Sequence, residues 1–307
     1  MNRKEFISQS LKMGVGAALL PGFLQSCQPQ DVVLTILHTN DMHSRIEPFP
    51  ATAGRNAGMG GMARRAAIIK RVRQEMSNVL LLDSGDIFQG TPYFNFFGGE
   101  VEYKLMSQMG YDASTLGNHD FDNGLEGLEH MLPHAQFPIL SANYDFSNTL
   151  LKNRFKPYKI FQKGPLKIGV FGLGIELQRL VPEKLYQGTQ YLDPIGVAGE
   201  IVEDLKAAQC DFIICLSHLG YQYQSDKVDD HKLAEAVSEI DLILGGHTHT
   251  FLDTPAEYTN AQGHATLINQ VGWAGINLGR IDVTFPAGKS KEIASTVLPV
   301  TEMLQPA

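Results

Sequence analysis

Short apolar segments rich in β-branched residues alternate with amphipathic segments along most of the chain, and this alternation limits the fold more than any other feature. Residues 32–37 (VVLTIL) and 212–216 (FIICL) have the length and composition of buried strands. Between such segments, residues 62–76 and 195–208 place apolar side chains at helical spacing. From Thr266 onward, strands follow one another with tight turns. The pattern predicts an α/β protein with its helices on the outside.

Five of the predicted strands are followed directly by polar side chains that can bind metal ions or move protons. They are Asp41 and His43 after 32–37, Asp86 after 79–82, Asn118, His119, Asp120 and Asp122 after 111–116, His218 after 212–216, and His247 and His249 after 242–244. Taken singly, Asp and His residues in such positions are usually turn formers or caps. Ligands of open α/β sheets bind beyond the carboxyl ends of the strands, so five clusters at one edge converge on one place.

The chemistry of these side chains points to metal ions. Aspartate, asparagine and imidazole together suit first-row divalent metals better than calcium or structural zinc. The candidate ligands are Asp41, His43, Asp86, Asn118, His218, His247 and His249. This set is too large for one tetrahedral ion and large enough for two ions that share a bridging carboxylate.

The same residues stand in five blocks that together resemble the calcineurin-like metallophosphoesterase superfamily. The blocks are D-x-H at Asp41 and His43, G-D at Gly85 and Asp86, G-N-H-D from Gly117 to Asp120, a lone histidine at His218, and G-H-x-H within GGHTH at 245–249. The stretches LTILHTNDMHSRI, GDIFQGTPYF, YDASTLGNHDFDNG and FPILSANY more narrowly resemble the catalytic domain of the periplasmic and ecto-5′-nucleotidases. The likeness runs from about Leu34 to about Phe285, and all five blocks occur in order.

The resemblance implies an α/β/β/α sandwich of four layers with a two-metal site at the carboxyl ends of its strands. It assigns Asp41, His43 and His249 to one ion, Asn118, His218 and His247 to the other, and Asp86 to a bridge between them. Two divalent ions are therefore the expected cofactors, with Mn, Zn, Fe and Co as the candidates.

Two further residues have expected roles in catalysis. The resemblance places His119 where the family has a histidine that stabilises the phosphoryl group and the leaving oxygen. It places Asp122 where a carboxylate orients that histidine. From the residues alone, Asp122 could instead be a favourable carboxylate at the N-terminus of the helix predicted at 125–132.

The implied function is a metal-dependent phosphohydrolase similar to the 5′-nucleotidases, in which hydroxide activated by two ions hydrolyses phosphate esters of nucleotides or related molecules. One alternative keeps the same site for phosphodiesters, nucleotide sugars or sulfur esters. Another is a non-catalytic metal or nucleotide binder, against which His119 counts because a binder needs no acid. The formal net charge of −8 argues against a nucleic-acid polymer as partner.

The two-domain nucleotidases continue into a C-terminal domain that supplies an aromatic stack for the base and arginines for the substrate. The present sequence ends at Ala307. We therefore expect either that a separate chain supplies such a domain or that the substrate is recognised differently.

The N-terminal segment has the features of an export signal. Arg3 and Lys4 precede a short apolar run at 13–20. That run is too short to cross a bilayer, which needs about 20 residues, and suits the core of a secretory signal. The segment NRKEFI at 2–7 is similar to a twin-arginine signal with lysine in the second place. A frayed amphipathic N-terminus is the alternative.

The segment LQSC at 24–27 resembles the cleavage box of bacterial lipoproteins, in which the cysteine becomes the lipid-bearing first residue. We therefore predict a signal peptide at 1–26 and a catalytic domain at 27–307. The mature protein is then exported to the periplasm or cell envelope, and a lipid on Cys27 anchors it to a bacterial membrane.

Several other residues are interpreted as structural. Arg64 and Arg65 are expected on a solvated helix face, and Asp120 is expected to be a bystander beside its neighbours. For Trp273 and the aromatic residues at 94–97, core packing is a stronger expectation than a place in a pocket.

Overall fold

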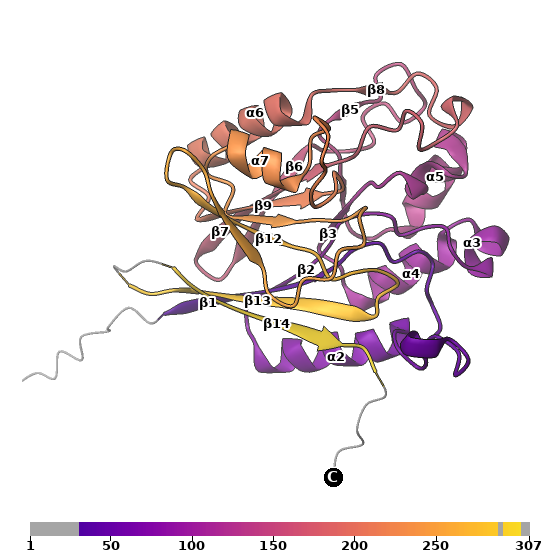
Figure 1. Cartoon of the computed structure of the whole chain (residues 1–307), viewed down its shortest axis with the longest axis horizontal. Helices are drawn as coiled ribbons and strands as arrows, with labels where there is room; N and C mark the ends of the chain where they lie inside the picture. The colour runs from indigo at the N-terminus through magenta and orange to yellow at the C-terminus, as the bar shows by residue number, and fades with distance from the viewer. Residues whose placement is uncertain (1–30, 288–290, 302–307) are drawn as a thin grey trace, which may run out of the picture. The chain divides into compact units, whose positions relative to one another are not determined.

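The computed structural model describes residues 31–287 and 291–301, and two six-stranded sheets form the centre of this part of the chain (Figure 1). The first sheet contains, in spatial order, β14 (Glu292–Pro299), β13 (Asn277–Phe285), β1 (Val32–Thr39), β2 (Val79–Asp83), β3 (Ala113–Thr115) and β4 (Ile139–Leu140). The second contains β11 (Ala256–Thr259), β12 (Ala265–Asn269), β10 (Leu242–Leu244), β9 (Phe212–Ser217), β7 (Leu166–Leu173) and β6 (Tyr158–Lys163). A small ladder pairs β5 (Tyr144–Asp145) with β8 (Gln190–Tyr191).

Helices cover the outer face of each sheet. Those on the first sheet are α2 (Met62–Glu75), α4 (Glu100–Met109) and α5 (Gly124–Met131), with the short α3 (Pro92–Phe97) ahead of α4. Those on the second sheet are α6 (Pro194–Ala207) and α7 (Asp230–Ala236). Short 3₁₀ turns occur at η1 (Gly54–Asn56), η2 (His119–Phe121), η3 (Leu132–His134) and η4 (Glu183–Leu185).

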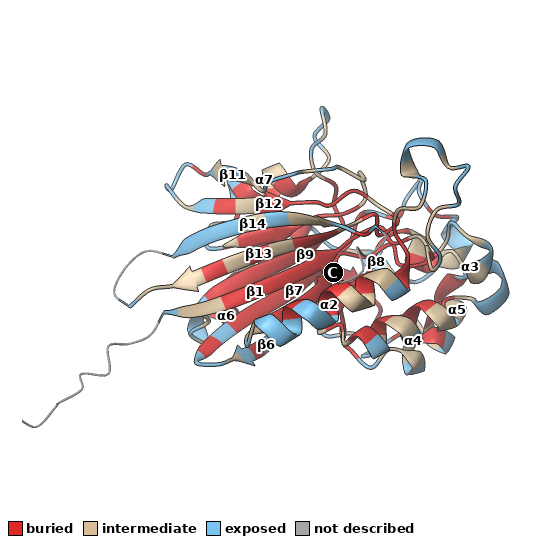
Figure 2. Ribbon diagram, turned by 90° about the horizontal axis from the view of Figure 1, so that it is seen from below, coloured by how far each residue is buried: buried red, intermediate tan, exposed pale blue. Residues whose placement is uncertain are grey.

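Three hydrophobic cores separate the layers, and the strand periodicity explains them. In β2, the side chains of Leu80 and Leu82 point into the core between the two sheets, whereas Leu81 points into the core under α2 and α4. In β9, Ile214 faces the first sheet and Ile213 faces α6 and α7. The central strands, such as β1, β7 and β9, are therefore buried on both faces, as the red ribbons of Figure 2 show, whereas β14 at the margin is mostly exposed. The predicted four-layer α/β/β/α fold is confirmed.

The strand directions gather the site loops at one edge. Strands β1 to β4 pair in parallel, and so do β7, β9, β10 and β12. The antiparallel strands lie at the margins of the two sheets. Parallel strands present all their carboxyl ends on the same side, so the loops after β1, β2, β3, β9 and β10 meet.

Arg65 and the exposed rings of α3 differ from the sequence-based expectations. Helix α2 buries Met62, Arg65, Ile69 and Val72, so the residue expected on a solvated face lies inside. The reason is spacing, because positions three or four apart share one helix face. The expected core packing holds for Phe94 but is wrong for Phe96 and Phe97, whose side chains are 79% and 48% exposed. It is also wrong for Trp273, which is only partly buried and lines a cavity.

The predictions for the signal peptide at 1–26 and for Cys27 lie outside the described residues and stay predictions. None of the helices in the described part of the chain combines the length and the apolar character needed to cross a bilayer.

Candidate two-metal site

The candidate ligands meet at the carboxyl edge of both sheets, as the strand-end pattern predicts. They form two groups in which the potential ligand atoms all lie within 4.8 Å of one another. One group is Asp41, His43 and His249, and the other is Asp86, His218 and His247. Asn118 joins the second group, because its Oδ1 atom lies 2.8 Å from Nδ1 of His247.

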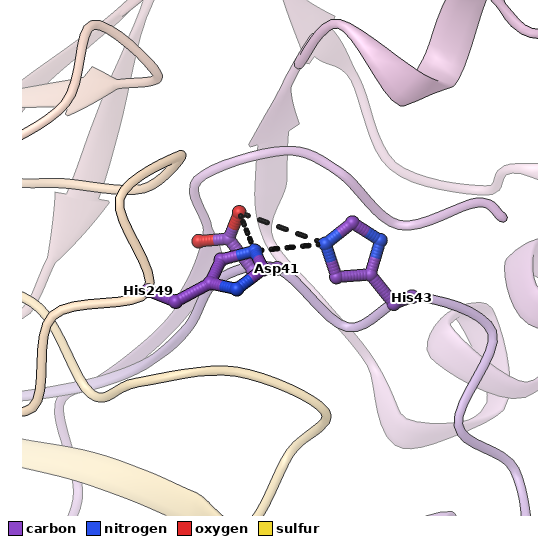
Figure 3. A group of neighbouring side chains, drawn as sticks. All are labelled: Asp41, His43 and His249. Atoms are coloured by element: carbon purple, nitrogen blue, oxygen red, sulfur yellow. Dashed lines mark hydrogen bonds and ion pairs between the residues drawn. The ribbon is translucent and has the colours of Figure 1, made fainter. Parts of the chain in front are cut away.

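In the first group, two imidazole rings converge on one carboxylate (Figure 3). Asp41 and His43 come from the loop after β1, and His249 comes from the turn after β10. Nε2 of His249 lies 3.3 Å from Oδ1 of Asp41 and 3.0 Å from Nε2 of His43. The His249 side chain is 39% exposed, so this group is open to solvent.

The second group lies deeper and contacts the first through Asp86. Oδ2 of Asp86 lies 3.1 Å from Nε2 of His218 and 3.9 Å from Nε2 of His43. The His218 side chain is fully buried, and Asp86 is nearly so. Asp86 thus faces both groups, which is the position that a bridging carboxylate requires.

The hydrogen bonds of His218 leave one ring nitrogen free for a ligand. Its Nδ1 lies 2.6 Å from the carbonyl oxygen of Ser84 and donates to it, so in the neutral ring the lone pair is on Nε2. Nε2 is buried and points at the carboxylates of Asp86 and Asp41, at 3.1 Å from Oδ2 of Asp86 and 3.9 Å from Oδ1 of Asp41. A histidine held from behind by a carbonyl oxygen is typical of metal ligands. This buried nitrogen, together with the carboxylates that it faces, fits a site for divalent cations.

Most of the candidate ligands adopt a left-handed backbone conformation, which is strained for residues other than glycine. Five of the seven candidate ligands have positive φ angles: Asp41 (49°), His43 (48°), Asp86 (54°), His247 (70°) and His249 (52°). For residues other than glycine this conformation costs of order 1–3 kcal/mol each and persists where surrounding structure enforces it. Gly117 shows how crowded the loops are, since a Cβ atom there would overlap Asp86 and His218.

Asp120 fixes two of these loops to each other, so its interpretation as a bystander is wrong. Its buried carboxylate accepts hydrogen bonds from the backbone N–H groups of Asp86 (3.1 Å), Ile87 (3.1 Å), Phe88 (3.3 Å) and Gly117 (2.8 Å). Burial, followed by the charge of Asp86, raises the pKa of Asp120 to about 7. Asp120 therefore supports the Asp86 loop and contacts no ligand atom through its own carboxylate.

Asp83, at the end of β2, is a second support that the strand-end pattern does not single out. It accepts hydrogen bonds from Thr39 Oγ1 (2.6 Å), the Gly85 N–H (3.0 Å) and Ser114 Oγ (3.1 Å), which belong to three neighbouring loops or strands. The carbonyl of Gly85 in turn accepts the N–H of Asp41 at 2.9 Å. Burial raises the pKa of Asp83 to about 6, and the charge of buried Arg65 opposes that shift.

His119 and Asp122 form a pair beside the two groups. Nδ1 of His119 lies 2.8 Å from Oδ2 of Asp122, and the backbone N–H of His119 donates to Oδ1 of Asp86 at 2.8 Å. The hydrogen bond to Asp122 raises the pKa of His119. Helix α5 begins after Asn123, which is its N-cap residue. The carboxylate of Asp122 bonds to His119 and does not cap the helix.

The imidazoles of the site differ in their pKa values because burial and the neighbouring charges act on each ring differently. Burial lowers the pKa of His43, and it lowers that of His247 to about 4, so both rings offer a lone pair at neutral pH. Burial also disfavours the charged form of His218, but Asp86 and Asp41 outweigh it and raise its pKa to about 10. Burial pushes the pKa of Asp86 upward, and His218 and His43 more than reverse that effect. His218 would have to give up this proton to hold a cation, which would then offset the charge of the carboxylates in its place.

Comparisons with known proteins agree with this geometry. The chain is 40% identical over 228 residues to a snake venom 5′-nucleotidase of Gloydius brevicauda, a match that covers 72% of this chain and 38% of the relative. The structure of a 5′-nucleotidase precursor from Thermus thermophilus superposes with a TM-score of 0.79 at 34% identity, covering 88% of this chain and 55% of that one. The structure of an NAD nucleotidase from Haemophilus influenzae superposes with a TM-score of 0.75 at 30% identity, covering 88% of this chain and 50% of that one.

The chain thus spans less than two fifths of the length of the snake venom relative. The family model for calcineurin-like phosphoesterases matches residues 34–251, which include every candidate ligand and the His119–Asp122 pair. This chain belongs to the calcineurin-like phosphoesterase family.

Proposed function

We propose that the chain is a metal-dependent phosphohydrolase, similar to the 5′-nucleotidases, that hydrolyses phosphate monoesters of nucleotides. The observation that carries this proposal is the meeting of two ligand groups at Asp86, with the His119–Asp122 pair directly beside them. Support also comes from the relatives, since those from snake venom and Thermus thermophilus are named 5′-nucleotidases.

The proposed ligand assignment follows the two groups. Asp41, His43 and His249 would hold one ion, Asn118, His218 and His247 the other, and Asp86 would contact both. When bound, two divalent ions act as Lewis acids on phosphoryl oxygens and lower the pKa of water. Oxygen and imidazole ligands suit Mn, Zn, Fe and Co, and we propose these four as the candidates.

His119 is proposed as the group that handles the leaving oxygen. Its Nδ1 is engaged by Asp122, so Nε2 is the atom that can donate a hydrogen bond or a proton to a bound phosphate ester. The raised pKa keeps a larger fraction of the ring protonated near neutral pH. A positioned acid of this kind contributes roughly 10²–10⁴-fold to a rate.

A substrate panel tests this function. The full chain is assayed with AMP, UDP-glucose, a cyclic nucleotide, bis-p-nitrophenyl phosphate and a thiosulfonate, each with Mn²⁺ or Zn²⁺ and again with chelator. We expect phosphate release from AMP that chelator abolishes. Turnover of diesters, nucleotide sugars or thiosulfonates alone would replace the nucleotidase assignment, and no chelator-sensitive turnover on any compound would rule out the enzyme.

Export and lipid anchoring form a separate proposal. It rests on the N-terminal sequence, namely the apolar run at 13–20 and Cys27. We expect the chain to fractionate with bacterial membranes and Cys27→Ala to fractionate with soluble periplasmic proteins. A variant that stays with the membranes would contradict the anchor.

Recognition of the nucleoside could come from a separate chain that carries a substrate domain. A pull-down of the full chain from the cell envelope would reveal such a partner as a stoichiometric companion. The alternative is that residues of this chain bind the nucleoside themselves.

A further inference from the structure

A continuous row of aromatic rings leads away from the open side of the candidate site. The ring of His119 lies 5.2 Å from that of His43, which lies 5.0 Å from that of His249. The Trp273 ring is nearly parallel to the His249 ring, at 9° and 5.8 Å between centroids. Phe49 then packs edge-on against Trp273 at 5.8 Å. The spacings are those of favourable aromatic pairs.

The loop that carries Trp273 is bonded to the loop that carries the first ligand. Asn40 donates to the carbonyl oxygen of Gly272 at 2.6 Å and accepts the N–H of Val271 at 3.0 Å. The N–H of Ala274 donates to the carbonyl oxygen of Asp41 at 2.7 Å. The indole is therefore held in a fixed place relative to Asp41.

Beyond Trp273 lies a cavity of about 320 Å³, which is within the size range of small-ligand sites. Phe251, two residues after His249, forms a wall of this cavity and is 48% exposed. Its ring lies directly against the backbone of Gly272, where a Cβ atom would overlap it. Arg55, Asn56 and Asn277 add polar groups to the lining.

This lining selects a flat ligand with a polar edge. Two aromatic walls favour a planar ring, because stacked rings gain more than apolar area alone. The two amides offer both donors and acceptors, and the guanidinium offers donors, to the edge of a heterocycle.

We propose that this cavity binds the nucleobase of a nucleotide whose phosphate lies at the neighbouring two-metal site. The link between cavity and site rests on the proposed function. The base stacks on Trp273 and Phe251, and the phosphate would lie past His249, beside the residues that would hold the ions. Stacking of this kind is sequence-tolerant, because every base has an aromatic face.

A binding experiment tests the base site without any turnover. Trp273 is the only tryptophan of the chain, so the indole fluorescence reports on this ring alone. The full chain is titrated with adenosine, and with ribose as the ligand that lacks a base. We expect saturable quenching by adenosine and none by ribose. Ribose and adenosine with equal effects, or no saturable change with adenosine, would overturn the proposal.

Variants of Phe251 separate stacking from general damage. Phe251→Ala should weaken adenosine binding about 10-fold, which is within the range for the loss of one stacked base. Phe251→Tyr keeps a ring and should bind within about twofold of the parent. Phe96→Ala removes an exposed ring outside the cavity and should bind like the parent. Equal binding by Phe251→Ala and Phe96→Ala would contradict the assignment.

Kinetics connect the base site to the reaction. In Phe251→Ala, the KM for AMP should rise about 10-fold while the KM for ribose 5-phosphate stays unchanged. An equal rise for both substrates would contradict a base-specific role. Quenching by adenosine in a chain that hydrolyses no phosphate ester would disprove the proposed function and leave the base site standing.

Discussion

The two ligand groups differ in their access to solvent. Asp86 and His218 are buried; the Ser84 carbonyl oxygen holds the His218 ring, and Asp120 accepts the backbone N–H of Asp86. The other group ends in His249, which is 39% exposed and stacks on Trp273. The difference indicates that the two groups have different roles. The buried half, which contains Asp86 and His218, fixes the geometry of the site, and the open half, which contains His249, contacts the substrate.

Two fully buried imidazoles show what distinguishes a ligand from a core residue. Burial alone lowers the pKa of His38 to about 3, so that ring is neutral. His218 is equally buried, yet Asp86 and Asp41 raise its pKa to about 10. The carboxylates that face a buried histidine, rather than its burial, mark the candidate site.

The largest effect is expected for the buried half. Asp86→Asn removes the carboxylate that faces both groups, so we expect a loss of activity of about 10⁴-fold, equivalent to the several kcal/mol that bound ions supply. Metal content by mass spectrometry should fall in parallel. Asp204→Asn, an exposed change on α6, is the control. Full metal content with full activity in Asp86→Asn would refute the bridging role.

Loss of the acid comes next. His119→Ala should reduce kcat about 10³-fold, in the middle of the range for a positioned acid, while both ions stay bound. The measurement pairs steady-state kinetics with metal analysis. If metal is lost together with activity, His119 supports the ligand loops instead of acting on the substrate.

Asp122→Asn tests whether Asp122 sets the pKa of His119 on the open side of the site. The carboxylate raises the pKa of His119, so its removal lowers that pKa, and the protonated ring is lost at lower pH. The alkaline limb of the kcat profile should therefore move to lower pH, with a rate loss of about 10–100-fold. An unmoved alkaline limb would show that a group other than His119 sets it.

The smallest effect is expected where the site is most open. His249→Asn keeps an oxygen or nitrogen ligand on an exposed side chain, so activity should stay within about tenfold of the parent. His218→Asn, the same change in the buried half, should lose far more, because it empties a packed position. Equal losses in the two variants would erase the distinction between the halves.

Much of the fold, and the grouping of the candidate ligands, could be predicted from the sequence, because both follow from local patterns. Asp41 and His218 come shortly after apolar runs with the length and composition of buried strands, and parallel strands bring their ends together. The supporting role of Asp120 could not be predicted in this way. It bonds to backbone groups of the loop at 86–88, more than 30 residues away, and nothing local marks that partner.

Two misjudged positions show the limits of residue type as a guide. The charge of Arg65 predicts a solvent-exposed side chain, but its position on the buried face of α2 places it inside the protein. There its charge lies near Asp83 and its Nη1 contacts Met42. The aromatic ring of Phe96 predicts a place in the core, yet this side chain is exposed on the short α3.

The ligand set draws on both sheets, and this has a consequence for how the molecule comes apart. His43 and His249 touch across a sequence separation of 206 residues, and the first sheet supplies one of them and the second the other. No portion of the chain shorter than that interval can assemble the complete set. An ion bound by this set would therefore link the two sheets, and its binding free energy would add to the free energy needed to separate them.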